Sequence, residues 1–449
     1  MLRISLLFIT LLLSHGGVAA PPAIPECAVF HHQGFNSNRH HDSSWRCKLA
    51  DASWQAISTG AVKFRPIHIE PNITPAHGKI KNILVLSSKL SSAYDESSLT
   101  LFQSLYGKAD HYRFTLFNYA QNCSTTPSSM RCPNADAALH KAMLDHFDLV
   151  VSMGSDTTIY LANHANFNTL PIVSACAKDP RHLGLLDQLD PQRPQHIAYT
   201  SLDIDPTLQI DYLQSLFLQK LKHIILLVDT DNISSIKTQA EPLEKTIQRQ
   251  HSNLSVTRLN IQLQGHYKKL IQTHQLEHYL NETLYRKLDH YRTQYAARTQ
   301  KIGLSPQTHS PDTLFLITGS TEIFNHIDAI NQHAGHIPVL SVTPSFITAG
   351  RHSAFMALGV SFTRNARKAA DYIYQILESG VSPSALPLGQ ISSPDIAINF
   401  RLLPTGFKVP YAFFENASYI FDLNGKAVRC DGKNVFPPEE SCRSTVFSG

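Results

Sequence analysis

The fold of this chain is decided by the stretch Val150–Ala162, which reads VVSMGSDTTIYLA. An apolar run ends at Met153, and Gly154 with a series of small polar residues leads directly into a helix-like pattern. A short, continuously apolar strand followed by a helix is typical of a parallel sheet that helices cover on both faces. The first N–H groups of such a helix can hold a carboxylate or a phosphate, and Ser155 or Asp156 is expected to cap it. The alternative is that these residues cap the helix and do nothing else.

The same alternation of strand and helix continues through most of the chain. We expect strands at residues 83–86, 114–117, 148–151, 171–173, 223–228, 254–261, 313–317, 337–341 and 354–362. We expect further helices at 96–106, 136–146, 236–250, 265–298 and 366–378. Because the strands form two consecutive sets of similar size, the sequence predicts an α/β protein with two doubly wound parallel-sheet lobes joined by crossovers.

The two ends of the chain lack this alternation. The first residues contain one cation, Arg3, an apolar core and Val18-Ala19-Ala20 before a proline pair, which predicts a signal peptide at 1–20. No later apolar run reaches the ~20 residues of a membrane-spanning helix, so the mature chain is expected to be periplasmic. We expect an irregular, disulfide-tied extension at 21–79 and a small disulfide-tied hairpin appendage at 417–449.

Six of the seven cysteines lie in close pairs. In an oxidising compartment such pairs predict three local disulfides, although spacing alone does not prove their connectivity. Cys176 is left over, and it is either a buried packing residue or a nucleophile, with no histidine context that identifies it as catalytic. The pairs are Cys27 with Cys47, Cys123 with Cys132, and Cys430 with Cys442.

Histidines are frequent, with 24 in the chain, and four of them lie inside the loop that the first cysteine pair would close. Zinc and copper accept such imidazole ligands. The alternative is a solvated loop of biased composition, because histidines also crowd residues 251–290. We therefore predict no metal site and keep these four as weak candidates: His31, His32, His40 and His41.

Charge and the absence of familiar motifs argue against several function classes. Lys plus Arg exceed Asp plus Glu by 39 − 35 = 4, and the basic residues are scattered, so we expect no nucleic-acid partner. The patterns GxGxxG, GxxxxGK[ST], GxSxG and HExxH do not occur. We therefore expect no cofactor and no enzymatic activity.

Small hydroxyl side chains stand at the carboxyl ends of the predicted strands. Ser87-Ser88 follows the first strand and Thr318-Gly319-Ser320-Thr321 follows a strand of the second set. The charges at such ends are Asp156, Asp179 and Asp229. Because open α/β sheets bind ligands at these ends, the sequence predicts a cleft for a small polar ligand.

Six segments resemble, in family order, the ABC-transporter substrate-binding protein family of the tryptophan/tyrosine-uptake type. The most distinctive is LPIVSACAKDP (170–180), a strand followed by small residues and Asp-Pro. The resemblance covers roughly residues 80–412. The other segments are SSAYDESSLTLFQSL (91–105), FTLFNYAQN (114–122), QKLKHIILLVDTDN (219–232), HIPVLSVTPSFITAG (336–350) and the stretch 365–410 that begins NARKAADYIYQ.

The resemblance implies the type I periplasmic binding protein fold, in which two lobes close around a ligand by a hinge motion. It implies crossovers near 202–206, 343–352 and 384–394. Lobe 1 would comprise 80–203 and 350–383, and lobe 2 would comprise 204–349 and 384–416.

The resemblance also implies which residues contact the ligand. For an amino-acid-like ligand, the helix start at Ser155–Thr157 would hold the carboxylate, an aspartate would take the amine, and Phe346 or Tyr94 would stack on an aromatic group. The implied contacts of lobe 1 are Ser87, Ser88, Tyr94, Ser155, Asp156, Thr157, Cys176 and Asp179. Those of lobe 2 are Asp229, Thr230, Gly319, Ser320, Thr321, Ser345 and Phe346.

The function implied is capture of a small polar or aromatic amino-acid-like solute by a monomer that delivers it to an ABC permease. The chain departs from the family at Pro194–Thr200, where the glycines usual in that crossover are missing. One alternative is a periplasmic sensing module that docks on a membrane-bound kinase or receptor. Another is an exported enzyme that uses Cys176, or a metal binder that uses the histidine-rich loop.

Overall fold

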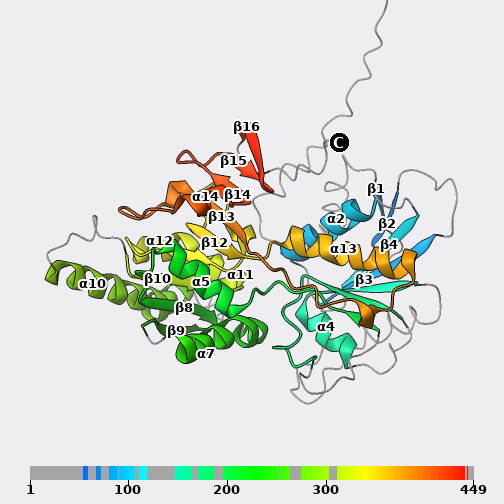
Figure 1. Ribbon diagram of the computed structural model, residues 1–449, viewed down its shortest axis with the longest axis horizontal. Coiled ribbons are helices and arrows are strands. Elements are labelled where there is room, and N and C mark those ends of the chain that lie inside the picture. The colour runs from blue at the N-terminus through cyan, green and yellow to red at the C-terminus, as the bar shows by residue number, and fades with distance from the viewer. Residues whose placement is uncertain are drawn as a thin grey trace, which may run out of the picture.

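The computed structural model describes residues 54–58, 67–71, 80–88, 91–106, 111–118, 147–163, 170–186, 196–251, 253–262, 275–302, 311–439 and 442. They form two α/β lobes, each built on one sheet (Figure 1). Several predictions lie outside the described residues: the signal peptide, the helix at 136–146, Cys27, Cys47, Cys123, Cys132, and the histidines His31, His32, His40 and His41.

Lobe 1 contains a seven-stranded sheet in the order β1-β2-β4-β3-β5-β6-β7. The strands from β4 to β7 run parallel, and β1 and β2 are antiparallel to their neighbours. The carboxyl ends of the parallel strands therefore meet at one edge. The strands are β1 (Trp54–Ser58), β2 (Ile67–Pro71), β3 (Lys81–Ser87), β4 (Tyr112–Asn118), β5 (Leu149–Met153), β6 (Ile172–Ala175) and β7 (Ile197–Ala198).

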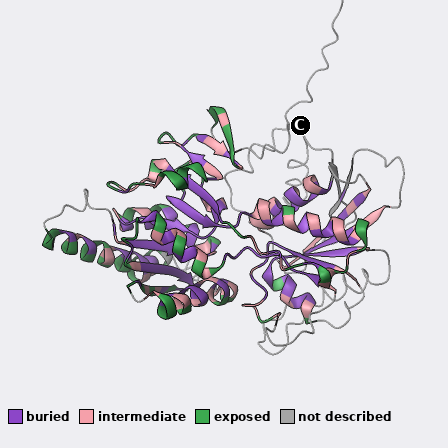
Figure 2. Cartoon of the chain, viewed as in Figure 1, coloured by how far each residue is buried: buried purple, intermediate pink, exposed green. Residues whose placement is uncertain are grey.

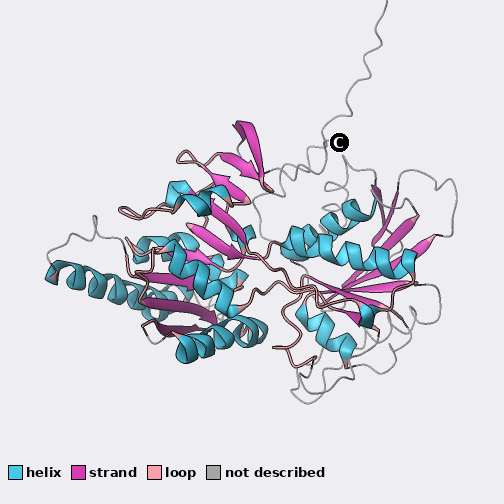
Figure 3. Cartoon of the chain, in the orientation of Figure 1, coloured by secondary structure: helices cyan, strands magenta, loops and turns pink. Residues whose placement is uncertain are grey.

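Helices cover both faces of this sheet, as Figure 3 shows. On one face α2 (Ser92–Tyr106) and α13 (Phe362–Ser379) pack against a core that includes Val151. On the other face α4 (Ser155–Ala162) packs against a core that includes Val150. Successive side chains of a strand point to opposite faces, so the side chains of β5 face both layers of helices. All of its residues are buried (Figure 2), and all but Ser152 are apolar.

Lobe 2 contains a nine-stranded sheet in the order β16-β15-β14-β13-β12-β11-β10-β8-β9. The part from β9 to β12 is parallel, and β13 joins β12 in the antiparallel direction. The strands are β8 (His223–Asp229), β9 (Ser255–Ile261), β10 (Thr313–Ile317), β11 (Val339–Ser341), β12 (Met356–Gly359), β13 (Asp395–Asn399), β14 (Tyr419–Phe421), β15 (Ala427–Cys430) and β16 (Lys433–Glu439).

The helices of lobe 2 also lie on two faces. The pair α5 (Pro206–Leu216) and α7 (Glu241–Gln250) shares one core, and the pair α10 (Arg286–Lys301) and α12 (Ile327–Ala334) shares the other. Both sheets are thus doubly wound, as the sequence predicted. Shorter helical elements are α6 (Ile233–Ser235), η4 (Ile236–Ala240), α9 (Leu276–Leu280), η5 (Asn281–Tyr285), α11 (Thr321–Phe324), η6 (Pro344–Phe346), η7 (Pro383–Ala385), η8 (Phe400–Leu402) and α14 (Tyr411–Glu415).

The chain passes between the lobes three times: between β7 and α5, between β12 and α13, and between α13 and β13. The second passage therefore follows β12, whereas the sequence analysis expected it near 343–352. Strand β12 was assigned to lobe 1, but it pairs with β11 and β13 in the sheet of lobe 2. An apolar strand can be buried equally well in either sheet. Only its hydrogen-bonded neighbours, β11 and β13, show that β12 belongs to lobe 2.

The two terminal extensions also differ from expectation. Residues 54–58 and 67–71, placed in an irregular extension, are strands that widen the sheet of lobe 1. The C-terminal hairpin is not a separate appendage, because β14 pairs in parallel with β13 and continues the sheet of lobe 2. The predicted disulfide Cys430–Cys442 is confirmed, with 5.5 Å between the Cα atoms.

Gly359→Ala should destabilise the protein strongly. A Cβ atom there would lie 1.8 Å from the carbonyl oxygen of Val342, and backbone atoms of two paired strands cannot move apart cheaply. We expect a loss of about 3 kcal/mol, at the upper end of overpacking costs, measured by urea unfolding. Gly350→Ala is the control, because its Cβ would meet only the His352 nitrogen at 3.8 Å. Equal unfolding midpoints for the two variants would contradict this account.

Candidate functional site

The start of helix α4 lies at the carboxyl edge of the lobe 1 sheet. Its N-cap is Gly154, with φ 88°, and no side chain caps the helix. The expectation that Ser155 or Asp156 caps the helix is therefore wrong: Ser155 Oγ instead accepts a hydrogen bond from the Lys178 backbone at 3.0 Å. A Cβ atom at position 154 would lie 2.1 Å from Tyr94 Oη, so only glycine fits under this tyrosine. Among the described residues no side chain caps this helix start, and the backbone N–H groups of such a start can hold an anion.

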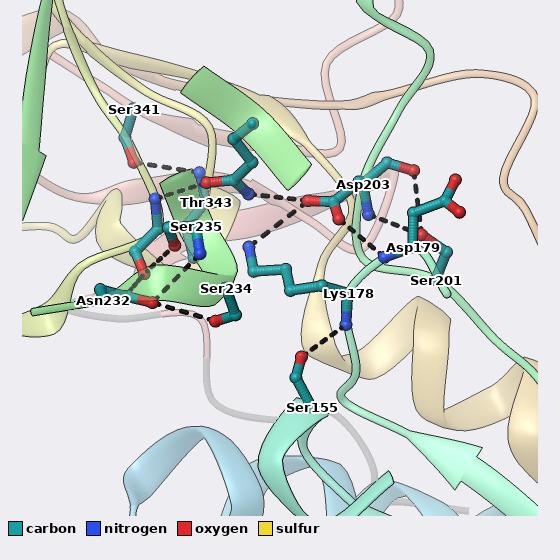
Figure 4. A network of polar contacts seen from close by, with 12 residues as sticks. Ser155, Lys178, Asp179, Ser201, Asp203, Asn232, Ser234, Ser235, Ser341 and Thr343 are labelled. Carbon is teal, nitrogen blue, oxygen red and sulfur yellow. Dashed lines mark hydrogen bonds and ion pairs between the residues drawn. The ribbon is translucent and has the colours of Figure 1, made fainter. Parts of the chain in front are cut away.

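A polar network joins this edge to lobe 2 (Figure 4). The carboxylate of Asp203, in the first crossover, accepts from the Asp179 backbone at 2.8 Å and from Gln239 Nε2 at 2.9 Å, and it pairs with Lys178 Nζ at 3.4 Å. Gln239 Oε1 in turn accepts from the backbone N–H of Gly319 at 2.8 Å. One buried carboxylate therefore connects both lobes.

Lys178 and Gly319 bring the two sheet edges into close approach. A Cβ atom on Gly319 would lie 2.8 Å from Lys178 Nζ. The Gly319 carbonyl accepts from Asn232 Nδ2 at 2.9 Å and from Ser235 Oγ at 3.1 Å, which holds this loop in place. The lysine ammonium thus lies against lobe 2 at the position where the strand ends face each other.

A second contact between the lobes is made by Glu96, on helix α2. Its Oε1 accepts from Ser345 Oγ of lobe 2 at 3.4 Å and from Thr363 Oγ1 at the start of α13 at 3.2 Å. Desolvation by burial raises the pKa of the Glu96 carboxyl, and the two hydroxyl hydrogen bonds offset this only in part. The ionised form of this carboxylate therefore lowers the free energy of unfolding relative to the protonated form.

The three aspartates at the predicted strand ends differ in burial and in their hydrogen-bond partners. Asp179 is 1% exposed, and the Arg181 guanidinium binds it through both carboxylate oxygens. Asp229 is equally buried, and it accepts from Ser320 Oγ at 3.0 Å and from the Asp231 backbone at 3.0 Å. Asp156 is exposed on the first turn of α4, where its charge suits the helix dipole.

Several other predicted contacts serve local structure. Thr230 continues the pairing of β8 with β9, since its N–H and hydroxyl both bind the Ile261 carbonyl. Phe346 stacks on Phe324 with ring centroids 4.2 Å apart, inside lobe 2. Thr321 is exposed at the start of α11.

Cys176 occupies an unusual backbone conformation at the end of β6. It has φ 54°, and its N–H donates to Asn365 Oδ1 at 2.8 Å, an oxygen that Thr200 Oγ1 also reaches at 3.2 Å. Such strain in a non-glycine residue is frequent near binding sites. Cys176 is 6% exposed and belongs to no disulfide. Its side chain faces the core, which fits packing better than nucleophilic attack.

Ser87 and Ser88 lie where expected, at the end of β3. Ser88 Oγ is buried and has no hydrogen-bond partner within the part of the chain that the structure describes. Thr157 is fully buried in the first turn of α4. The structure thus brings the helix start, the serines and Lys178 to one edge of lobe 1, opposite Gly319 and Ser345.

Four residues of this interface were missed in the sequence: Glu96, Lys178, Asp203 and Gln239. Lys178 and Asp203 each follow a strand, so the search for strand ends could have included them. Glu96 and Gln239 lie inside helical segments, where one polar residue among many carries no signal. Within the described ranges there is no cluster of His, Cys, Asp and Glu suited to a metal ion, and no helix of the length and apolarity needed to cross a membrane.

Comparison with known proteins identifies the fold. No protein-family model and no curated protein matches the chain. A conserved domain protein from Vibrio cholerae is similar over 77% of this chain and 100% of its own, at 16% identity and a TM-score of 0.52. A ligand-free, open substrate-binding protein with adhesive properties from Clostridium difficile is similar over 76% of this chain and 99% of its own, at 17% identity and a TM-score of 0.50. The chain has the type I periplasmic binding fold.

A further similar structure is an ABC domain from Streptococcus pneumonia in complex with L-Trp. It covers 76% of this chain and 100% of its own, at 16% identity and a TM-score of 0.49. These similarities establish the fold of the backbone. They do not establish the function, which depends on the particular residues at the ligand-binding cleft.

Asp203→Ala should cost more stability than any surface substitution in the crossover. It removes a buried carboxylate and leaves Lys178 and Gln239 without their acceptor, for which we expect a loss of about 3 kcal/mol. Asp205→Ala, two residues away, removes only the exposed N-cap of α5 and should cost about 1 kcal/mol. Urea unfolding of both variants measures the difference. Similar losses would mean that Asp203 does not join the lobes.

Glu96→Gln should stabilise the protein at neutral pH and leave it unchanged in acid. Because the folded-state pKa is raised above 4.5, the wild type loses stability relative to the glutamine variant as the pH rises above that value. Tyr419, whose pKa burial raises and nearby carboxylates raise further, stays neutral over this range. Melting temperatures between about pH 4 and about pH 8 measure the effect.

The control for this experiment is Glu415→Gln, which changes an exposed glutamate on α14 and should follow the wild type at every pH. A difference between wild type and Glu96→Gln that stays constant with pH would show that Glu96 is not the titrating group.

Proposed function

We propose that this chain is a periplasmic solute-binding protein that closes two lobes around a small polar or aromatic amino-acid-like ligand and delivers it to an ABC permease. The observation that carries the proposal is the contact between the two sheet edges, where Lys178 of lobe 1 lies against Gly319 of lobe 2. In an open α/β sheet these edges are where ligands bind.

The chemistry of the edges supports a ligand with an anionic end. The start of α4 offers backbone N–H groups. The backbone N–H of Lys178 donates to Ser155 there, and the Lys178 ammonium, paired with Asp203, supplies a positive charge at the facing edge of lobe 2. The buried hydroxyl of Ser88 supplies a further polar group that a ligand can pair with. In this proposal the cleft binds and releases, and it performs no reaction.

A second candidate is a ligand-sensing module that docks on a membrane-bound kinase or receptor. It is supported by large apolar side chains that the C-terminal part of lobe 2 exposes, among them Tyr411, Leu423 and Phe436. Such exposed groups often mark a surface that contacts a partner. Both candidate functions use the same ligand cleft. They differ in the membrane protein that the ligand-bound chain contacts, which is an ABC permease in the first and a kinase or receptor in the second.

A thermal-shift screen tests ligand binding. The probes are L-tryptophan, L-tyrosine, L-leucine, glucose and galactose, added to the full mature chain. A ligand at about 100 times its Kd should add ~2.7 kcal/mol to stability. Gly319→Val should weaken the affinity about tenfold, because its Cβ would lie 2.8 Å from Lys178 Nζ and would displace the lysine from the facing edge.

Gly350→Val is the matched control, since position 350 is exposed and open, and it should bind like the wild type. No stabilisation of the wild type by any probe would overturn the proposal for these ligand classes. A response that Gly319→Val leaves unchanged would move the binding site away from the facing edges.

A further inference from the structure

We propose that Glu96 recognises a cationic group of the ligand, such as the amino group of an amino acid, and so sets the charge selectivity of the cleft. This inference rests on the proposed function, because it assigns one residue of the same cleft to one part of the ligand.

The position of Glu96 is the first argument. It lies in the second turn of α2, just after the carboxyl end of β3, and its Oε1 is reached by hydroxyls from two directions. Ser345 Oγ comes from lobe 2 at 3.4 Å, and Thr363 Oγ1 comes from the start of α13 at 3.2 Å. The carboxylate therefore lies at the boundary of the two lobes.

The absence of a matching cation is the second argument. Asp179 is paired with Arg181, Asp203 with Lys178, and Asp395 with Arg364 at 3.2 Å. Among the described residues no lysine or arginine forms such a pair with Glu96, and both of its hydrogen-bond donors are neutral. Removing a carboxylate from water costs free energy unless a cation compensates it.

A ligand ammonium would supply that compensation. It would form a charge-assisted hydrogen bond with the carboxylate, which is about twice as strong as a bond between neutral groups. The hydroxyl of Thr363, which belongs to the same lobe, orients the carboxylate before the ligand arrives, so less ordering is left for binding. The raised pKa of Glu96 agrees with this geometry, because a buried acid without a cation holds its proton more tightly.

The competing explanation is that Glu96 only holds the lobes together through its hydroxyl contacts. Glutamine distinguishes the two explanations. Its Oε1 can accept the same hydrogen bonds from Ser345 and Thr363, but it carries no charge. A structural role would survive Glu96→Gln, whereas recognition of a cation would not.

The experiment compares each amino acid with the acid that lacks its amino group. The probes are L-tryptophan with indole-3-propanoate, L-tyrosine with 3-(4-hydroxyphenyl)propanoate, and L-leucine with 4-methylpentanoate. Dissociation constants are measured by calorimetry for the wild type, Glu96→Gln and the control Glu415→Gln. The wild type and the control should prefer the amino acid at least about tenfold, and Glu96→Gln should lose this preference while binding the deaminated acid as before.

The outcomes separate this inference from the proposed function. Equal binding of both partners of a pair by the wild type would overturn the role of Glu96 and leave solute binding intact. So would a Glu96→Gln variant that keeps the preference, or a wild type that binds the sugars alone. If the wild type binds no probe and no sugar, the proposed function fails and this inference fails with it.

Discussion

The carboxylate of Asp203 is the interaction on which the relation between the two lobes depends. It lies in the first crossover, and it receives a backbone N–H from lobe 1, a lysine ammonium from lobe 1 and a side-chain amide from lobe 2. A carboxylate this deeply buried is stable only when all its acceptor capacity is used. The arrangement therefore constrains three segments at once: the loop after β6, the crossover itself and the π-helical turn η4.

Glu96 and Asp203 show opposite ways of placing a carboxylate between two lobes. Asp203 has a lysine partner, so its charge is balanced within the protein. Among the described residues Glu96 has only hydroxyl donors, so its negative charge is not balanced by a cationic side chain and a cationic group of the ligand could balance it. The contrast separates a group that supports the architecture from a group suited to recognition, and residue type alone would not have separated them.

Much of the fold could be predicted from local patterns, and much of the site could not. The stretch around Gly154 was correctly read as a strand that turns into a helix, because four of the five residues of β5 are apolar, all five are buried, and a glycine follows them. Asp179 and Asp229 were also found at strand ends. Their hydrogen-bond partners, Arg181 and Ser320, could not be foreseen from the sequence. The predicted contacts of these aspartates, and of Tyr94, Ser155 and Ser345, with a ligand stay predictions.

The sequence by itself determined the α/β class of this protein, since short apolar strands that alternate with helices form parallel sheets buried on both faces. It also predicted a disulfide between Cys430 and Cys442 from their short spacing, and the structure shows this pairing. The tertiary structure alone decided that β12 belongs to lobe 2 and that Glu96 meets Ser345, 249 residues away. The physical reason is that periodicity reports how a segment contacts its own sheet, whereas the ends of strands and helices gain their charge partners from segments far away in the chain.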